Sequence, residues 1–282
     1  MRVTLLGLGL IGGSIARALR VASEPPDRIV AWTPVGRGPA AALAAGAVDE
    51  VAGSLADAVA DADLVVLAGP PVACIALLAA LGDGLVERMA AGATVTDVAS
   101  TKGVITRAAA AAAVPFAGGH PMAGRETSGF GAGDATLFVD RPWVVTEAVA
   151  GGDTDAVQWL AGACRARAVA LRADEHDALV AAISHLPLLA SVALVESVTS
   201  APDWDLARTL AATGWRDATR LARGDVAMGS DIAATNAPAL AARLRAYRDR
   251  IDAWLALLEA DAGPDMEAIT AALADARRRL ES

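Results

Sequence analysis

A glycine-rich turn near the start of the chain constrains the fold more than any other feature. It runs Gly7-Leu8-Gly9-Leu10-Ile11-Gly12, after a short apolar strand pattern and before a helical pattern that continues to Leu19. In such a turn the first glycine allows a tight bend. The second lets the backbone approach a pyrophosphate, and the third lets helix and strand pack closely. A glycine turn without a ligand is the alternative. The placement favours a dinucleotide site that includes Gly7, Gly9, Leu10, Ile11 and Gly12.

Short β-rich stretches alternate with helical patterns through the first half of the chain. The predicted strands cover residues 3–6, 28–32, 63–68, 93–97, 116–117, 143–146 and 168–171. This alternation is typical of a parallel sheet with helices on both faces. After Asp174 only helical patterns remain. We therefore expect an α/β Rossmann-type nucleotide-binding domain over residues 1–172, followed by an all-α dimerisation domain over residues 173–282.

The helical half is more apolar than its own core requires. Residues 178–195 contain no acidic or basic side chain apart from His185. Pro187 and the polar Ser184 and Ser191 favour a helix buried in protein over a membrane span. A helix that is apolar all round belongs in a core or a subunit interface. We expect a homodimer with these helices at the two-fold interface.

Charge and cysteine content exclude several classes of partner. The formal net charge is −9, and no basic footprint for nucleic acid is present. Cys74 and Cys164 lie far apart and show no metal-ligand spacing, so we expect no metal site and a reducing, cytoplasmic location. An anionic ligand must be held by local positive groups acting against the overall field.

The end of the second predicted strand bears on the choice of cofactor. An NAD site commonly has an acidic residue there to bind the ribose 2′-hydroxyl, but this chain has Thr33, with Arg37 close by. Without a carboxylate, a 2′-phosphate is not repelled, and Arg37 could pair with it. A solvated loop arginine is the alternative. The cofactor is therefore NAD+ or NADP+.

Two motifs follow the fourth and fifth predicted strands, at the edge where open α/β sheets bind ligands. They are Asp97-Val98-Ala99-Ser100-Thr101-Lys102-Gly103 and Gly118-Gly119-His120-Pro121-Met122-Ala123-Gly124-Arg125-Glu126. Ser184-His185-Leu186-Pro187, preceded by His176-Asp177, and later Thr219-Arg220 complete the set. With these motifs the chain resembles, over nearly its whole length, the prephenate and arogenate dehydrogenases of tyrosine biosynthesis.

The resemblance implies oxidation of a 4-hydroxycyclohexadienyl acid by NAD+ or NADP+ with loss of CO₂. Prephenate would give 4-hydroxyphenylpyruvate, and arogenate would give tyrosine. It implies that His120 accepts the hydroxyl proton, a suitable task for a neutral imidazole, with Ser100 beside it. It also implies that His185, Arg220 and Glu126 lie at the substrate. The guanidinium fork of arginine matches a carboxylate.

Some assignments stay open. Lys102 is either a site cation or a turn residue, and Arg216 or Lys102 could bind the substrate carboxylate instead of Arg220. We expect His176, between two acidic residues, to be structural. The chain departs from the family pattern at Leu188, at Met228-Gly229 and at Thr33. Substrate choice is therefore open, and a dehydrogenase of a 4-amino analogue in secondary metabolism would look similar.

Two other functions compete with this interpretation. A β-hydroxyacid dehydrogenase or imine reductase would need a catalytic lysine or another donor in the helical half, but the only lysine is Lys102. A nucleotide sensor that has lost its chemistry would have no need to retain His120, Ser100, His185 and Arg220 together.

Overall fold

The computed structural model describes residues 1–34, 37–125, 127–261 and 263–281, in two compact units, Met1–Ala237 and Pro238–Ser282. The strands are β1 (Arg2–Leu6), β2 (Arg28–Trp32), β3 (Glu50–Val51), β4 (Leu64–Leu67), β5 (Thr94–Asp97), β6 (Phe116–Pro121), β7 (Pro142–Val149) and β8 (Arg167–Ala170). The α-helices of the sheet region are α1 (Leu10–Arg20), α2 (Arg37–Ala44), α3 (Leu55–Val59), α4 (Pro71–Gly82), α5 (Gly103–Ala111) and α6 (Thr154–Ala163). The later helices are α7 (Ala173–Val180), the π-helical η3 (Ala181–His185), α8 (Leu186–Thr199), α9 (Trp204–Leu210), α10 (Thr213–Ala218), the 3₁₀ turn η4 (Leu221–Arg223), α11 (Val226–Thr235), α12 (Ala237–Leu258) and α13 (Met266–Glu281).

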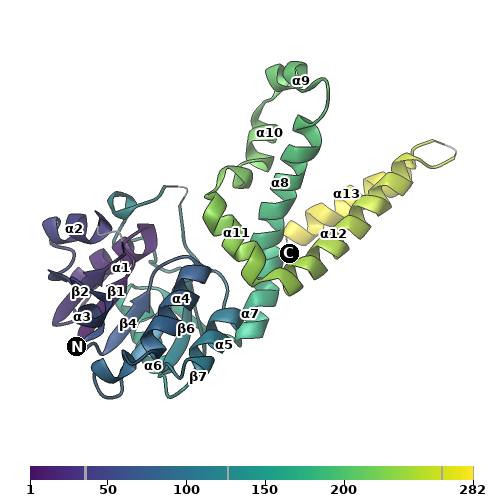
Figure 1. Ribbon diagram of the computed structural model, residues 1–282. Coiled ribbons are helices and arrows are strands. Elements are labelled where there is room, and N and C mark those ends of the chain that lie inside the picture. Colours follow the sequence, from purple (N-terminus) through teal and green to yellow (C-terminus); the bar gives the residue numbers. More distant parts are fainter. Residues whose placement is uncertain (35–36, 126, 262, 282) are drawn as a thin grey trace. The chain divides into compact units, whose positions relative to one another are not determined.

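The sheet has the order β3-β2-β1-β4-β5-β6-β7-β8, and Figure 1 labels β1, β2, β4, β6 and β7 in it. The predicted parallel pairing is confirmed for β2, β1, β4, β5 and β6, and β3, which was not predicted, also pairs parallel to β2. The prediction is wrong for β7, which pairs antiparallel to β6 and parallel to β8. The reason is that the chain leaves β6 and enters β7 at the same edge of the sheet, so residues 122–141 need no crossover. Within this connection, residues 130–132 pack against α1, the helix that the glycine turn opens.

Two buried clusters lie on opposite faces of the sheet, as alternating strand residues predict. Val3 and Leu5 pack with Ile15 and Leu19 of α1 and with residues of α2 and α6. The intervening Leu6 packs in the second cluster, with residues of α3, α4 and α5. The helices thus cover both faces, as in a doubly wound fold.

The glycine turn needs glycine at the positions that the sequence singled out. Gly7 has φ +121°, and a Cβ there would lie 2.4 Å from the carbonyl oxygen of Ala68. A Cβ on Gly12 would lie 2.1 Å from the carbonyl oxygen of Gly7. A Cβ on Gly9 would meet no atom within 4 Å. Gly7 and Gly12 therefore permit close packing, whereas Gly9 leaves one side of the turn open.

The predicted apolar helix is a continuous helical stretch, Ala173–Thr199, made of α7, η3 and α8. By length and composition this helix could cross a membrane, but one such helix is only weak evidence for a membrane span. In its most apolar window, 22% of the residues are buried. The π-helical turn lies just before Pro187. Proline has no backbone N–H group, so it cannot donate the regular helical hydrogen bond.

The predicted domain boundary after residue 172 does not coincide with a boundary between the compact units, because α7 packs against α5 and β7. That boundary stays a prediction.

Candidate active site

A cavity of about 630 Å³ lies at the carboxyl edge of the sheet, within the first unit. Its walls come from the glycine turn, from the segments after β4, β5 and β6, and from residues 220–228. The predicted site residues that line it are Gly9, Leu10, Ile11, Ser100, His120 and Arg220. Residues from four distant parts of the sequence thus share one hollow.

The other predicted residues are placed differently. Gly7 and Gly12 are not among the described residues that line the cavity, and a Cβ on either would come within 3.0 Å of an atom of Ala68. Thr33 directly follows β2 but is not among the described residues that line the cavity. Arg37 is the first residue of α2, and its side chain, like the whole of Glu126, lies outside the described part. The roles predicted for the Arg37 side chain and for Glu126 therefore lie outside the described residues and stay predictions.

The start of α1 is suited to an anion. Gly9 caps this helix without a side-chain hydrogen bond, and its first turn contains no acidic residue. The first backbone N–H groups of a helix have no partner within the helix, and its N-terminus carries partial positive charge. Since Gly9, Leu10 and Ile11 line the cavity, a pyrophosphate fits there.

His120 lies in β6, at the end that borders the cavity, and is half-buried. Its Nδ1 is 2.8 Å from Nε2 of His176 in α7. Burial, and then the nearby His176, Lys102 and His185, hold the pKa of His120 well below its usual 6.5. Near neutral pH the ring is therefore uncharged and can accept a proton.

His185 ends the π-helical turn and is 1% exposed. The Asn236 amide nitrogen donates to the backbone oxygen of Asp177 (2.8 Å) and lies 3.1 Å from His185 Nδ1, which must accept because an NH₂ group cannot. The proton of the neutral ring is therefore on Nε2, which has no partner among the described residues.

Burial dominates the electrostatics of His185. It lowers the pKa of this histidine to about 4, although nearby Asp177 opposes the shift. His185 is thus a buried neutral donor with an unused N–H group. It is not one of the described cavity-lining residues, so the structure does not bring it into the same hollow as His120 and Arg220.

Lys102 resolves one of the open assignments. Its side chain is fully buried and forms an ion pair with the equally buried Asp97. Asp97 also accepts hydrogen bonds from the backbone N–H groups of Ala99 (3.1 Å) and Gly119 (3.2 Å). Lys102 is therefore an internal partner of Asp97, rather than a cation open to substrate.

The sequence analysis did not single out Arg125 and Arg223, which line the cavity with Arg220. Arg125 lies in the motif that contains His120, whereas nothing in the sequence marks Arg223 among 23 arginines. Arg125 is paired with Asp134, so the guanidinium groups of Arg220 and Arg223 contribute most to the local positive charge that an anionic ligand needs in a chain of net charge −9.

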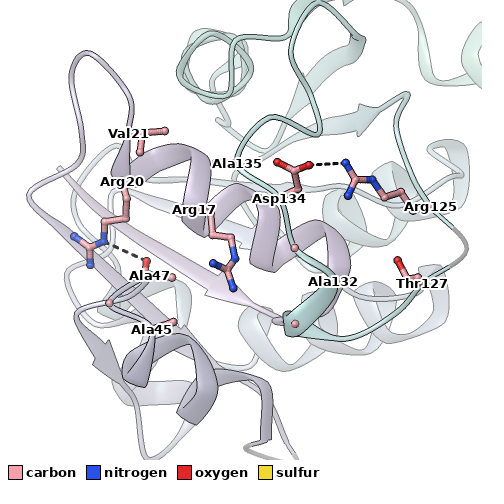
Figure 2. A pocket seen from close by; sticks show the side chains of 13 residues that line it. Arg17, Arg20, Val21, Ala45, Ala47, Arg125, Thr127, Ala132, Asp134 and Ala135 are labelled. Atoms are coloured by element: carbon pink, nitrogen blue, oxygen red, sulfur yellow. Dashed lines mark hydrogen bonds and ion pairs between the residues drawn. The ribbon is translucent and has the colours of Figure 1, made fainter.

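A second cavity, of about 720 Å³, lies beside α1 (Figure 2). Figure 2 shows Arg17, Arg20 and Arg125 around it, with Arg20 bonded to the Ala47 carbonyl and Arg125 paired with Asp134. Its described lining includes neither histidine nor serine and none of Gly7, Gly9 and Gly12. The first cavity is therefore the candidate active site.

Comparison with known proteins agrees with this geometry. Residues 15–169 match the family model "Prephenate dehydrogenase, nucleotide-binding domain", and residues 172–273 match "Prephenate dehydrogenase, dimerization domain". The chain is similar to a prephenate dehydrogenase of Bacillus subtilis, with 33% identity over 262 residues, covering 90% of this chain and 67% of the relative.

Two solved structures are similar over almost their whole length. One is an arogenate dehydrogenase of Synechocystis, with a TM-score of 0.80 and 28% identity, covering 99% of this chain and 100% of the other. The second is a prephenate dehydrogenase of A. aeolicus in complex with hydroxyphenyl propionate and NAD+. It has a TM-score of 0.86 and 24% identity, with coverages of 100% and 98%, and the likeness is one of fold.

Proposed function

This chain belongs to the prephenate dehydrogenase family, an NAD(P)+-dependent group of oxidoreductases, and on that premise we propose that it oxidises prephenate to 4-hydroxyphenylpyruvate and CO₂. The observation that carries the proposal is the single cavity shared by the glycine turn, Ser100, His120 and Arg220. It offers an anion site for the cofactor, a neutral base and a cation for a substrate carboxylate. The proposed location is the cytoplasm.

The nicotinamide ring, when bound, accepts a hydride. The residues of this chain would hold the reacting groups around it. Gly9 leaves room for the pyrophosphate at the start of α1. Ser100 and His120 line the cavity where the substrate hydroxyl would lie. The hydroxyl proton would pass to His120 as the hydroxyl-bearing carbon loses its hydride.

Loss of CO₂ completes the reaction. The electron pair of the broken carbon–carbon bond enters the ring, which becomes aromatic. The phenolic oxygen then takes back the proton from His120. The reaction thus releases no net proton, so His120 would hold the proton for one turnover and return it.

The test is the absorbance at 340 nm with prephenate or arogenate and with NAD+ or NADP+. We expect reduction of the cofactor with prephenate, and the comparison of NAD+ with NADP+ measures the cofactor preference. Preference for arogenate would revise the substrate. Absence of cofactor reduction with both acids would contradict the proposal.

The proposed carboxylate contact gives a prediction for Arg220. A charge-assisted hydrogen bond is worth about 1.5–3 kcal/mol, so Arg220→Ala is expected to raise KM for the substrate at least about tenfold. Arg220→Lys is expected to recover only part, because an ammonium cannot reproduce the guanidinium fork. Arg216→Ala is the matched control, since Arg216 is exposed on α10 and is not in the described lining of the cavity. An unchanged KM in Arg220→Ala would remove Arg220 from the substrate site.

We further propose that the chain acts as a homodimer through α8 and its neighbours. The support is the match of residues 172–273 to a dimerization domain and the exposed apolar side chains of this region. Ile183 is 69% exposed and Leu194 is 36% exposed. Covering such side chains removes apolar surface from water, which stabilises an obligate interface.

Light scattering at micromolar concentration is therefore expected to give the mass of a dimer. Ile183→Asp is expected to shift the mass toward the monomer, since a dimer would then bury an unpaired charge. Val21→Asp, at a 71% exposed site after α1, is the control and should remain dimeric. A monomeric parent protein would contradict the proposal.

A further inference from the structure

Two buried residues of α7 form a chain of hydrogen bonds that ends at His120. His120 Nδ1 lies 2.8 Å from Nε2 of His176, and the other ring nitrogen of His176, Nδ1, lies 2.9 Å from Oδ1 of Asp177. His176 is 0% exposed and Asp177 is 8% exposed. Both ring nitrogens of His176 are therefore engaged within the protein, one by an acid and one by His120.

The positions of the protons in this chain follow from the acid at its end. Burial tends to raise the pKa of Asp177, but hydrogen bonds from His176 and from the backbone N–H groups of Lys102 and Gly103 hold that pKa below its usual 3.8. The carboxylate can only accept, so His176 Nδ1 carries the proton. In the neutral ring of His176, Nε2 then has only a lone pair, and His120 Nδ1 donates to it. His120 Nε2 is left without a proton.

Asp177 also binds the segment that carries Ser100. Its Oδ1 accepts the backbone N–H of Lys102 (2.7 Å), and its Oδ2 accepts that of Gly103 (2.8 Å). These two residues stand at the start of α5, where a negative charge is favourable. The carboxylate of Asp177 thus binds the backbone just after Ser100. Through His176, the same carboxylate also orients the ring of His120.

We propose that His176 and Asp177 are positioning residues that hold His120 in the tautomer whose Nε2 lone pair is available to the substrate hydroxyl, and that Asp177 also fixes the loop of Ser100. When His120 takes up a proton at Nε2, the hydrogen bond from its Nδ1–H to His176 stays in place. The negative charge of Asp177, beyond His176, then favours the charged ring of His120. The bond that forms is Nε2–H and the bond that breaks is the substrate O–H. The catalytic meaning rests on the proposed function, but the tautomer does not.

The first measurement is therefore independent of activity. In ¹⁵N-labelled parent protein at pH 7, His120 is expected to show a protonated Nδ1 and an unprotonated Nε2, with His176 in the same form. In His176→Phe, which keeps a ring of similar size without a hydrogen bond, His120 is expected to lose this preference. A parent protein in which His120 Nε2 carries the proton would overturn the proposal, even if no variant folds.

The second measurement separates positioning from binding. His176→Phe is expected to lower kcat at least about tenfold, part of the usual 10²–10⁴-fold worth of a general base. The Kd for NAD+ and the KM for substrate should change little. His176→Gln is expected to recover part of kcat, because its amide oxygen can accept from His120 Nδ1. Asp174→Asn, at an exposed site on the same helix, is the matched control.

The pH profile gives a third readout. The titratable groups that act on His120 are His176 of α7, Lys102 and His185 of η3, and behind them Asp177 is bonded to His176 and Asp97 to Lys102. Activity requires unprotonated His120, so kcat falls as pH falls through its pKa. Asp177→Asn removes a negative charge that favours the imidazolium, so this acid limb should move to lower pH. An unmoved limb together with parental kcat in both Asp177→Asn and His176→Phe would overturn the proposal.

Discussion

Replacing His120 with alanine is expected to lower kcat by about 10²–10⁴-fold, the usual contribution of a positioned general base. The physical reason is that no other neutral histidine lines the cavity in the described part of the chain. The Kd for NAD+ should stay near its parental value, because the glycine turn and the start of α1 are untouched. The measurements are steady-state kinetics at pH 7 and calorimetry with the cofactor. Near-parental turnover with intact cofactor binding would remove His120 from the chemistry.

Replacing Lys102 with methionine is expected to lower the free energy of unfolding by about 3–5 kcal/mol, as for other broken buried ion pairs. The variant leaves the carboxylate of Asp97 without its cation at a fully buried site. Urea denaturation followed by circular dichroism measures the change.

Two further variants test this cause. The double variant Asp97→Asn with Lys102→Met should recover part of the loss, because no charge remains buried. Arg28→Met breaks the Arg28–Glu50 pair, where the arginine side chain is 53% exposed, and should cost at most about 1 kcal/mol. If Lys102→Met and Arg28→Met lower the free energy of unfolding equally, burial does not determine how much the Lys102–Asp97 pair contributes to stability.

Local patterns predicted most of the sheet correctly. The strands at β1, β2, β4 and β5 lie within a residue or two of the predicted ranges, since buried strands are continuous apolar runs. The two-residue β3 was missed, because so short a strand carries no periodic signal. The strand at β7 was predicted, but its antiparallel direction was not. The direction of a strand depends on which edge the preceding connection reaches, and hydrophobic pattern does not encode that.

The candidate site was predicted less evenly. Motifs at strand ends correctly predicted that Ser100 and His120 share an edge with the glycine turn. The same reasoning treated His176 as structural and left Lys102 open. His176 bonds to His120, and Lys102 bonds to Asp97. Both partners depend on how the elements pack together, and the contact between His176 and His120 spans 56 residues of sequence. Pairings of this kind appear only in three dimensions.

The burial of Lys102 also has a practical consequence for chemical labelling. It is the only lysine in the sequence, and its ammonium is inaccessible and bound to Asp97. Acylating reagents that modify side-chain amines should therefore leave the folded chain unmodified at this residue and should react as it opens. The rate at which Lys102 is acylated, followed in the peptide that contains it, would then report how often the core beneath the cavity opens. No labelled residue has to be introduced for this measurement.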